Sequence, residues 1–163
     1  MKTVAEDLNT GAKYTVELAD DNLEALQTLA NDRVSDSKLQ SYIDNLNLSA
    51  DAKALIASIL KTAIKVGEVV IRIGKRIVEL VLMIASKFPN ATFGLVLGLL
   101  VGFLIASIPA LGAFLGPFAT PIAAVFGLAK GYTEDIKDQN LNRKIMEASA
   151  MFQPLKGEAH VVG

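Results

Sequence analysis

Few residues in this chain have the types and spacing needed for catalysis. Ser35 with Lys38 and Ser58 with Lys61 match the serine–lysine spacing of penicillin-binding enzymes, but the partner motifs of those enzymes are missing. His160, the only histidine, lies in a tail expected to be flexible, which suits neither a catalytic triad nor a metal site. The chain has no cysteine, which excludes thiolate catalysis and cysteine-based zinc sites. We therefore expect a protein that is not an enzyme and that needs no metal and no cofactor.

A second set of polar residues has the spacing of a charged stripe on one helix. Charged side chains recur every three or four positions between residues 61 and 79, with mainly aliphatic residues and glycine between them. This charged stripe consists of Lys61, Lys65, Glu68, Arg72, Lys75, Arg76 and Glu79. A helix that is polar along one thin line inverts the usual proportions of a surface helix. Three interpretations stay open: a face lying on anionic lipid headgroups, the wet face of a helix in a bundle, or the wall of a water-filled lumen.

The charged stripe predicts one long amphipathic helix over residues 49–87. Ser49 is a good N-cap, and Asp51 in the first turn meets the positive end of the helix dipole. No residue before Pro89 has to stop such a helix. The stripe has a net charge of +3, which would favour anions at a lumen wall. Its neighbours are aliphatic and not aromatic, which argues against nucleic acid as a partner.

The most apolar part of the chain follows this predicted helix. Residues 88–129 contain no Asp, Glu, Lys, Arg or His, and this run is about twice the ~20 apolar residues that one membrane span needs. Pro109 separates two arms, 91–108 and 110–129, each about 27–30 Å long as a helix. Pro117 and Pro121 are expected to kink or break the second arm, so the three prolines are candidate hinges. The run predicts a hydrophobic transmembrane hairpin.

Small residues recur at every fourth position along both arms of this hairpin. The positions are Gly94, Gly98, Gly102 and Ala106 on the first arm, and Gly112 and Gly116 on the second. In lipid no hydrophobic force pulls helices together, and small residues let their backbones approach closely. These small-residue ridges are therefore candidate packing surfaces, either between the two arms of one chain or between the subunits of a homo-oligomer.

The segments at either end have the composition of water-facing structure. Residues 1–50 hold four Lys/Arg against nine Asp/Glu, so residues 1–48 are expected to form a small acidic head with helices near 20–33 and 35–46. For residues 1–18 a short hairpin and a loose tail stay equally open. Residues 130–163 predict a C-terminal helix and a flexible tail. Cations flank the charge-free run on both sides and none lies in its bend, so we expect an inner or plasma membrane location with both termini cytoplasmic.

Together these patterns predict an all-α membrane protein with a small helical head, a long amphipathic helix, a hydrophobic helical hairpin and a C-terminal helix. The long charge-free hairpin in a helical chain without cysteine resembles the buried hairpin of pore-forming colicins, over residues 88–129 and by pattern alone. We expect a non-enzymatic homo-oligomer that forms a pore or permeabilises a membrane, with the lipid bilayer and its own copies as partners. The alternative is a non-conducting membrane anchor or assembly scaffold whose acidic head, residues 1–48, binds a cytoplasmic protein.

Overall fold

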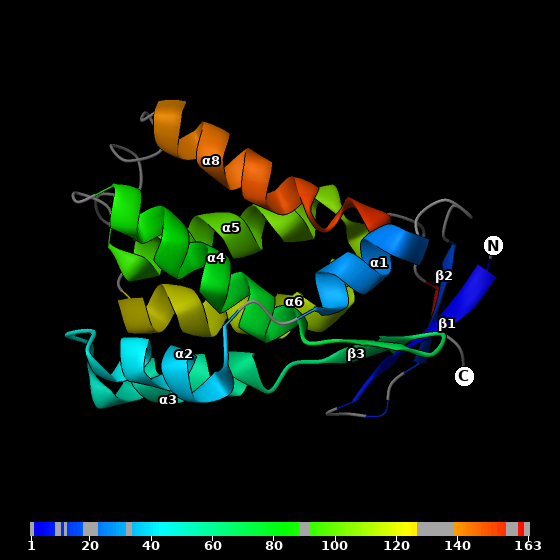
Figure 1. Ribbon diagram of the computed structural model, residues 1–163, viewed down its shortest axis with the longest axis horizontal. Coiled ribbons are helices and arrows are strands. Elements are labelled where there is room, and N and C mark those ends of the chain that lie inside the picture. The colour runs from blue at the N-terminus through cyan, green and yellow to red at the C-terminus, as the bar shows by residue number, and fades with distance from the viewer. Residues whose placement is uncertain are drawn as a thin grey trace.

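The computed structural model describes residues 2–8, 11, 13–17, 23–31, 34–88, 92–126, 139–155 and 160–161. Within these residues the chain is mostly helical. The helices are α1 (Leu23–Ala30), α2 (Asp36–Asp44), α3 (Ala50–Leu60), α4 (Ile73–Lys87), α5 (Phe93–Ser107), α6 (Pro109–Phe126) and α8 (Gln139–Ala150), with a 3-10 turn at Gln153–Leu155. The strands are β1 (Lys2–Asp7), β2 (Lys13–Glu17), β3 (Ile64–Val66), β4 (Val69–Ile71) and β5 (His160–Val161). Figure 1 shows the strands gathered at one end of a set of roughly aligned helices.

Side-chain caps begin three of the helices. The hydroxyls of Ser35, Ser49 and Thr92 each accept a hydrogen bond from the backbone N–H three positions further on, at the start of α2, α3 and α5. Each cap satisfies one of the N–H groups that a helix leaves without an internal partner. The predicted N-cap at Ser49 is therefore confirmed, as are the two helices of the head and the C-terminal helix α8. The residues that were expected to open the C-terminal helix, 130–138, lie outside the described part of the chain.

The all-α prediction is wrong, because the described strands form a five-stranded antiparallel sheet in the order β4-β3-β1-β2-β5. The first residues form the hairpin β1–β2, near Gly11 with its φ of +77°. A second hairpin, β3–β4, pairs Val66 with Val69 around a two-residue turn that begins at Gly67, where φ is +63°. Glycine takes positive φ at no steric cost, and a first-position glycine suits a tight hairpin turn. The β3–β4 hairpin lies inside the segment that was predicted to be helix.

The single helix predicted over residues 49–87 is also wrong, since α3 ends at Leu60 and α4 begins only at Ile73. The residues between them are rich in Val and Ile, which suit a pleated sheet better than a helix. After the β3–β4 hairpin the chain returns so closely that the backbone N–H of Gly74 donates to the Thr62 carbonyl, 3.1 Å away. A Cβ on Gly74 would stand 1.6 Å from the Ile59 carbonyl oxygen, so only glycine fits there. Helices α3 and α4, joined by the β3–β4 hairpin, therefore take the place of the single predicted helix.

The helical hairpin of the charge-free run is present as α5 and α6, and Ile108 is the only residue between them. The expected break at Pro117 and Pro121 is absent, because α6 continues through both prolines to Phe126. Pro109 is the first residue of α6, a position where its missing N–H costs nothing. Residues 127–129, the expected end of the second arm, lie outside the described residues. Nowhere in the described part of the chain is a helix both long enough and apolar enough to cross a membrane.

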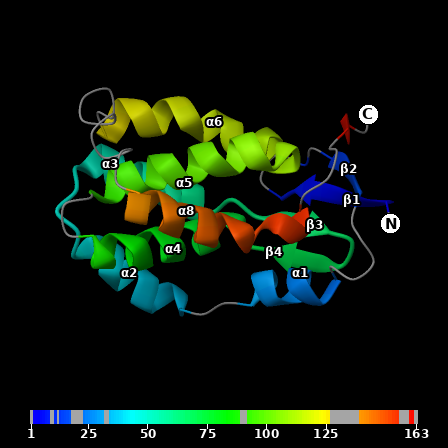
Figure 2. The same cartoon turned by 90° about the horizontal axis from the view of Figure 1, so that it is seen from above.

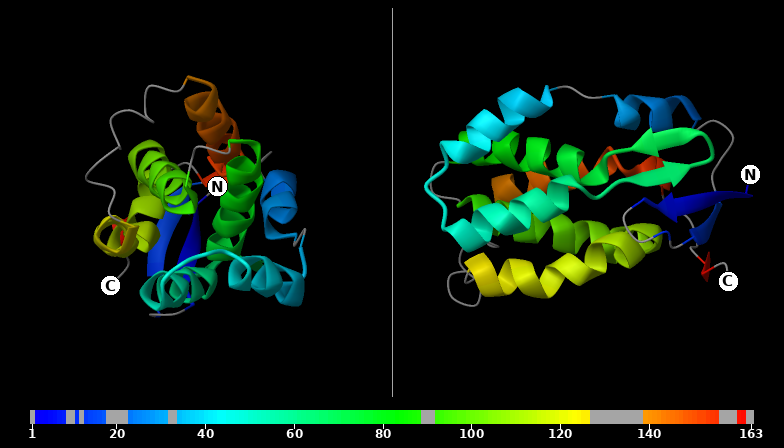
Figure 3. Two further views of the ribbon diagram at one scale, coloured as in Figure 1. Left: turned by 90° about the vertical axis from the view of Figure 1, so that its left-hand side faces the viewer. Right: turned by 90° about the horizontal axis from the view of Figure 1, so that it is seen from below.

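Helix α5 lies at the centre of the molecule. It packs against α4, α6 and α8, and most of its leucine and valine side chains are buried. Figures 2 and 3 show α8 on one side of the α4–α5 layer and α3 and α6 on the other. One hydrophobic cluster joins side chains from the sheet, from α1 to α6, from α8 and from the turn after it, such as Ala5, Leu29, Leu97 and Phe152. A helix that is apolar all round is buried either in lipid or in a protein core, and α5 occupies the core here.

Candidate functional site

The structure divides the charged stripe into two parts because the predicted long helix is not formed. Lys61 caps the end of α3, Lys65 lies on β3 and Glu68 lies in the hairpin turn, and all three are exposed. The other four residues lie at the N-cap and on the first turns of α4, where α1 and α2 meet this helix (Figure 1). These are Arg72, Lys75, Arg76 and Glu79. The first part faces water, whereas the second part is engaged with the head.

Arg76 attaches the end of α1 to α4. Its guanidinium is almost completely buried and donates to the backbone carbonyls of Thr28 (3.4 Å), Leu29 (3.1 Å) and Asn31. The last carbonyls of a helix have no partner within it and carry partial negative charge, so a buried cation satisfies them directly. The guanidinium also lies 3.5 Å from the Glu79 carboxylate, whose side chain is 8 % exposed. Arg76 therefore joins the head to α4 through several contacts at once.

Two further cations of α4 meet at Asp36, in the first turn of α2. The guanidinium of Arg72 and the ammonium of Lys75 each lie 2.8 Å from the same carboxylate oxygen. The hydrogen bond from Lys75, followed by that from Arg72, lowers the pKa of Asp36 below its usual value of 3.8. No spacing pattern points to this contact, because Asp36 lies 36 residues before Arg72. We refer to Asp36, Arg72 and Lys75 as the Asp36 clamp.

The small-residue ridges are used for packing within the chain at one end only. A Cβ on Gly94 would stand 2.4 Å from ring carbons of Phe126, so the end of α6 packs directly on this glycine. A Cβ on Gly112 would stand at an ordinary 3.7 Å from Ile105. A Cβ on Gly102 or on Gly116 would have no neighbour within 4 Å. Gly98 is half-buried and Ala106 is exposed, so the middle of both ridges faces away from the core.

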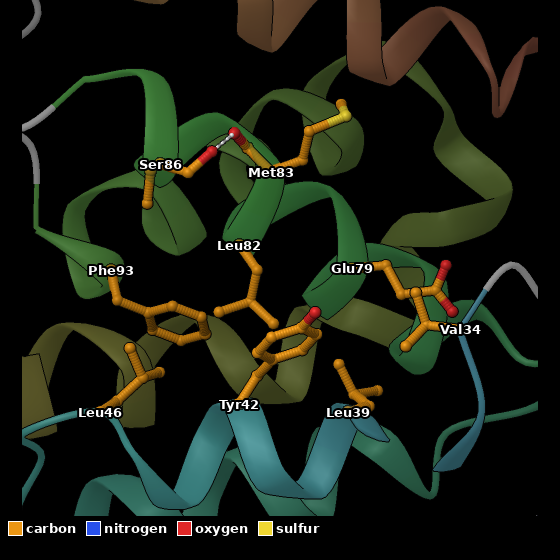
Figure 4. A pocket seen from close by; sticks show the side chains of 10 residues that line it. Val34, Leu39, Tyr42, Leu46, Glu79, Leu82, Met83, Ser86 and Phe93 are labelled. Carbon is orange, nitrogen blue, oxygen red and sulfur yellow. Dashed lines mark hydrogen bonds between the residues drawn. The ribbon is translucent and has the colours of Figure 1, made fainter. Parts of the chain in front are cut away.

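A pocket that the sequence did not indicate lies between α2 and α4, as Figure 4 shows. It has a volume of about 660 Å³, within the range of small-molecule sites. Leu39 and Tyr42 of α2, with Leu46 just after this helix, line one wall, and α4 with Phe93 of α5 completes the pocket. The residues that α4 contributes are Glu79, Leu82, Met83, Ala85 and Ser86. Helical spacing in the sequence places Leu39, Tyr42 and Leu46 on one face, but it does not show that this face borders a pocket.

Metal binding has no support among the described residues. No group of three or more His, Cys, Asp or Glu side chains comes together there in a way that would hold a metal ion. Comparison of the chain with protein families, with curated proteins and with solved structures found no match in any of the three. The features of the described residues that bear on function are the charge-free hairpin, the charged stripe and the pocket.

Proposed function

We propose that this chain is a non-enzymatic membrane protein that permeabilises a membrane as a homo-oligomer. One observation carries the proposal: α6 lies at the edge of the bundle and exposes a face without any charge. The exposed residues of this face are Gly116, Pro117, Ala119, Thr120, Ala123 and Ala124. Gly102 and Ala106 of the neighbouring α5 are exposed as well. Helices that face water normally carry charged residues there, so this charge-free face suits acyl chains or another copy of itself.

The open space at the middle of the small-residue ridges supports self-association. Because a Cβ on Gly102 or Gly116 would meet nothing, a second helix can approach the backbone closely at these positions. In the described conformation α4 and α8 cover α5. The proposal therefore requires these amphipathic helices to move away before the hairpin, residues 88–129, enters the bilayer. Cations on both flanks of the hairpin support an inner or plasma membrane location with both termini on the cytoplasmic side.

The same proposal also gives the cations of the charged stripe a role. In the described conformation Lys75 and Arg76 are engaged by α1 and α2. If the head leaves α4, these cations become available to lipid phosphates or to a lumen wall. Lys65 is exposed without any such change, so a charge reversal there can probe the stripe without disturbing the core.

Dye release from vesicles containing anionic lipid tests the proposal directly, together with conductance across a planar bilayer. The informative variant is Gly102→Leu combined with Gly116→Leu, which fills open space and leaves the core untouched. We expect the wild-type chain to release dye and the double variant to lose most of this activity. Ala57→Leu on the exposed face of α3 is the matched control and should behave as wild type. If the folded wild-type chain releases no dye and produces no conductance across the bilayer, the proposal is contradicted.

A second candidate, a non-conducting membrane anchor or scaffold, is favoured by the engagement of the stripe within the chain. The contacts of Arg72, Lys75 and Arg76 hold the head in place, so the exposed acidic surface of residues 1–48 would be presented to a cytoplasmic protein. Lys65→Glu separates the two candidates. In a pore this reversal should change the ratio of anion to cation permeability, whereas in an anchor no current exists for it to change.

A further inference from the structure

The pocket between α2 and α4 has an apolar end and a polar end. In Figure 4 Phe93 and Leu46 lie at one end, and Glu79 and Val34 lie at the other. Leu82 points into the space between them from α4, opposite Tyr42 of α2. This arrangement matches an elongated ligand with one aliphatic part and one polar head, because apolar lining contributes affinity while a few polar groups fix orientation.

The polar end sets the charge that such a head can carry. Glu79 lines the pocket, whereas its partner Arg76 is buried behind it and does not. A carboxylate head would therefore meet another carboxylate at the wall, next to the Glu79 side chain, which is only 8 % exposed. A cationic head would face the positive charge that already compensates Glu79. A hydroxyl or amide head can donate to the carboxylate without bringing in a charge that needs compensation.

We propose that this pocket binds an uncharged single-chain amphiphile, with its aliphatic chain between Leu46, Leu82 and Phe93 and a hydrogen-bond-donating head at Glu79. The pocket volume of about 660 Å³ leaves room for a chain of this kind. The half-exposed Tyr42 and Met83, at 47 % and 45 %, are the apolar surface that the ligand would cover. This inference does not rest on the membrane activity, because the ligand enters from solution.

Calorimetric titration with 1-decanol and with decanoate, both below their aggregation limits and without any bilayer, tests the proposal. The two probes share one chain length and differ in the head. We expect saturable binding of 1-decanol and binding of decanoate weaker by about tenfold or more, which corresponds to about 1.4 kcal/mol. Equal or tighter binding of decanoate would overturn the uncharged head, and no binding of 1-decanol to the folded chain would overturn the site.

Two variants locate the binding. Ser86→Phe fills the pocket from an exposed position on α4 and should weaken the binding of 1-decanol by at least about tenfold. Ser41→Phe is the same change at an exposed position of α2 that does not line the pocket, and it should bind as wild type. Tyr42→Ala removes an exposed wall residue, so it should also weaken binding in a chain that stays folded. Unchanged affinity in both Ser86→Phe and Tyr42→Ala would place the ligand elsewhere and contradict the proposal. None of these results depends on dye release, so either proposal can fail alone.

Discussion

The ammonium of Lys75, on a side chain that is 2 % exposed, lies 2.8 Å from the carboxylate of Asp36, which is 67 % exposed. A buried cation on α4 is thus compensated by a surface carboxylate on α2, at the point where the head meets the bundle. Burying a charge is costly unless it is paired, so the position of α2 and the burial of Lys75 depend on each other. The Asp36 clamp is therefore a structural link that can be broken by changing one exposed residue.

Asp36→Asn is expected to loosen the attachment of α2 to α4. The amide keeps the shape of the carboxylate and removes the negative charge that compensates Lys75 and Arg72. We expect a lower midpoint of urea unfolding and faster amide exchange in α2, with little change in α5. Asp44→Asn makes the same charge change at the other end of α2, away from these cations, and should leave the midpoint unchanged or slightly raised. Equal effects of the two substitutions would contradict the clamp.

The lowered pKa of Asp36 gives this contribution a defined pH dependence. A carboxyl group whose pKa is lower in the folded state stabilises the fold fully above its unfolded pKa, here near 3.8. The contribution is lost as the pH falls through the lower folded pKa. The difference in free energy of unfolding between wild type and Asp36→Asn should therefore stay constant between pH 7 and about pH 5 and shrink below about pH 4. A difference that grows on acidification would contradict this assignment.

Arg76→Lys tests whether the planar guanidinium, and not charge alone, holds α1. A lysine keeps the positive charge, but its single ammonium cannot reach the carbonyls of α1 and the Glu79 carboxylate together. We expect a loss of roughly 1–3 kcal/mol in the free energy of unfolding, measured by urea denaturation. Proteolysis should begin in or near α1. Arg143→Lys on the exposed face of α8 is the control and should cost nothing measurable.

The first glycine of the first small-residue ridge and a glycine in its middle should respond in opposite directions to the same substitution. Gly94→Ala brings a methyl group against the ring of Phe126 and should cost roughly 1–3 kcal/mol. Gly102→Ala adds a methyl group in open space and should stabilise α5 by up to about 1 kcal/mol, because alanine favours helices more than glycine does. Thermal unfolding of the two variants measures both signs. A Gly94→Ala variant as stable as Gly102→Ala would mean that α6 does not pack there.

Local patterns in the sequence predict the helices whose formation depends on interactions between residues close in the chain. Serine and aspartate at helix starts, apolar periodicity and Pro109 indicate α1, α2, the start of α3, and the pair α5 and α6. The Asp36 clamp and the contacts of Arg76 escape prediction because they join residues far apart in the chain. The pocket escapes prediction for the same reason, since its walls come from α2, α4 and α5.

The region between α3 and α4 was mispredicted because two patterns overlap in it. Charged residues three or four apart from Lys61 to Arg72 fit a helix, while Ile64–Val66 and Val69–Ile71 around Gly67 fit a hairpin. The hairpin forms because its buried face, with Ile64, Val66 and Ile71, joins the main hydrophobic cluster. A continuous helix would place these β-branched residues around its circumference with no core to cover them all. Tertiary burial decides between two patterns that the sequence supports equally.

The sign of the stability change caused by Gly74→Ala distinguishes one continuous helix over residues 49–87 from two helices joined by the β3–β4 hairpin. In one continuous helix over residues 49–87, replacing an internal glycine by alanine would stabilise the chain by about 1 kcal/mol. In the described structure the new methyl group would stand 1.6 Å from the Ile59 carbonyl oxygen, a backbone atom that cannot rotate away. The start of α4 must then separate from the end of α3, and the hydrogen bond from the Gly74 N–H to Thr62 is strained or lost.

We expect Gly74→Ala to lower the free energy of unfolding by about 3 kcal/mol or more, a size reached when a core contact is forced apart. Chemical denaturation of Gly74→Ala beside Gly102→Ala provides the comparison, because both replace a helical glycine in a chain that is otherwise identical. If Gly74→Ala raises stability as much as Gly102→Ala does, then α3 and α4 form one helix in solution and the junction with the β3–β4 hairpin is not populated. If Gly74→Ala alone is destabilising, the charged stripe cannot lie along one helix face in the folded chain.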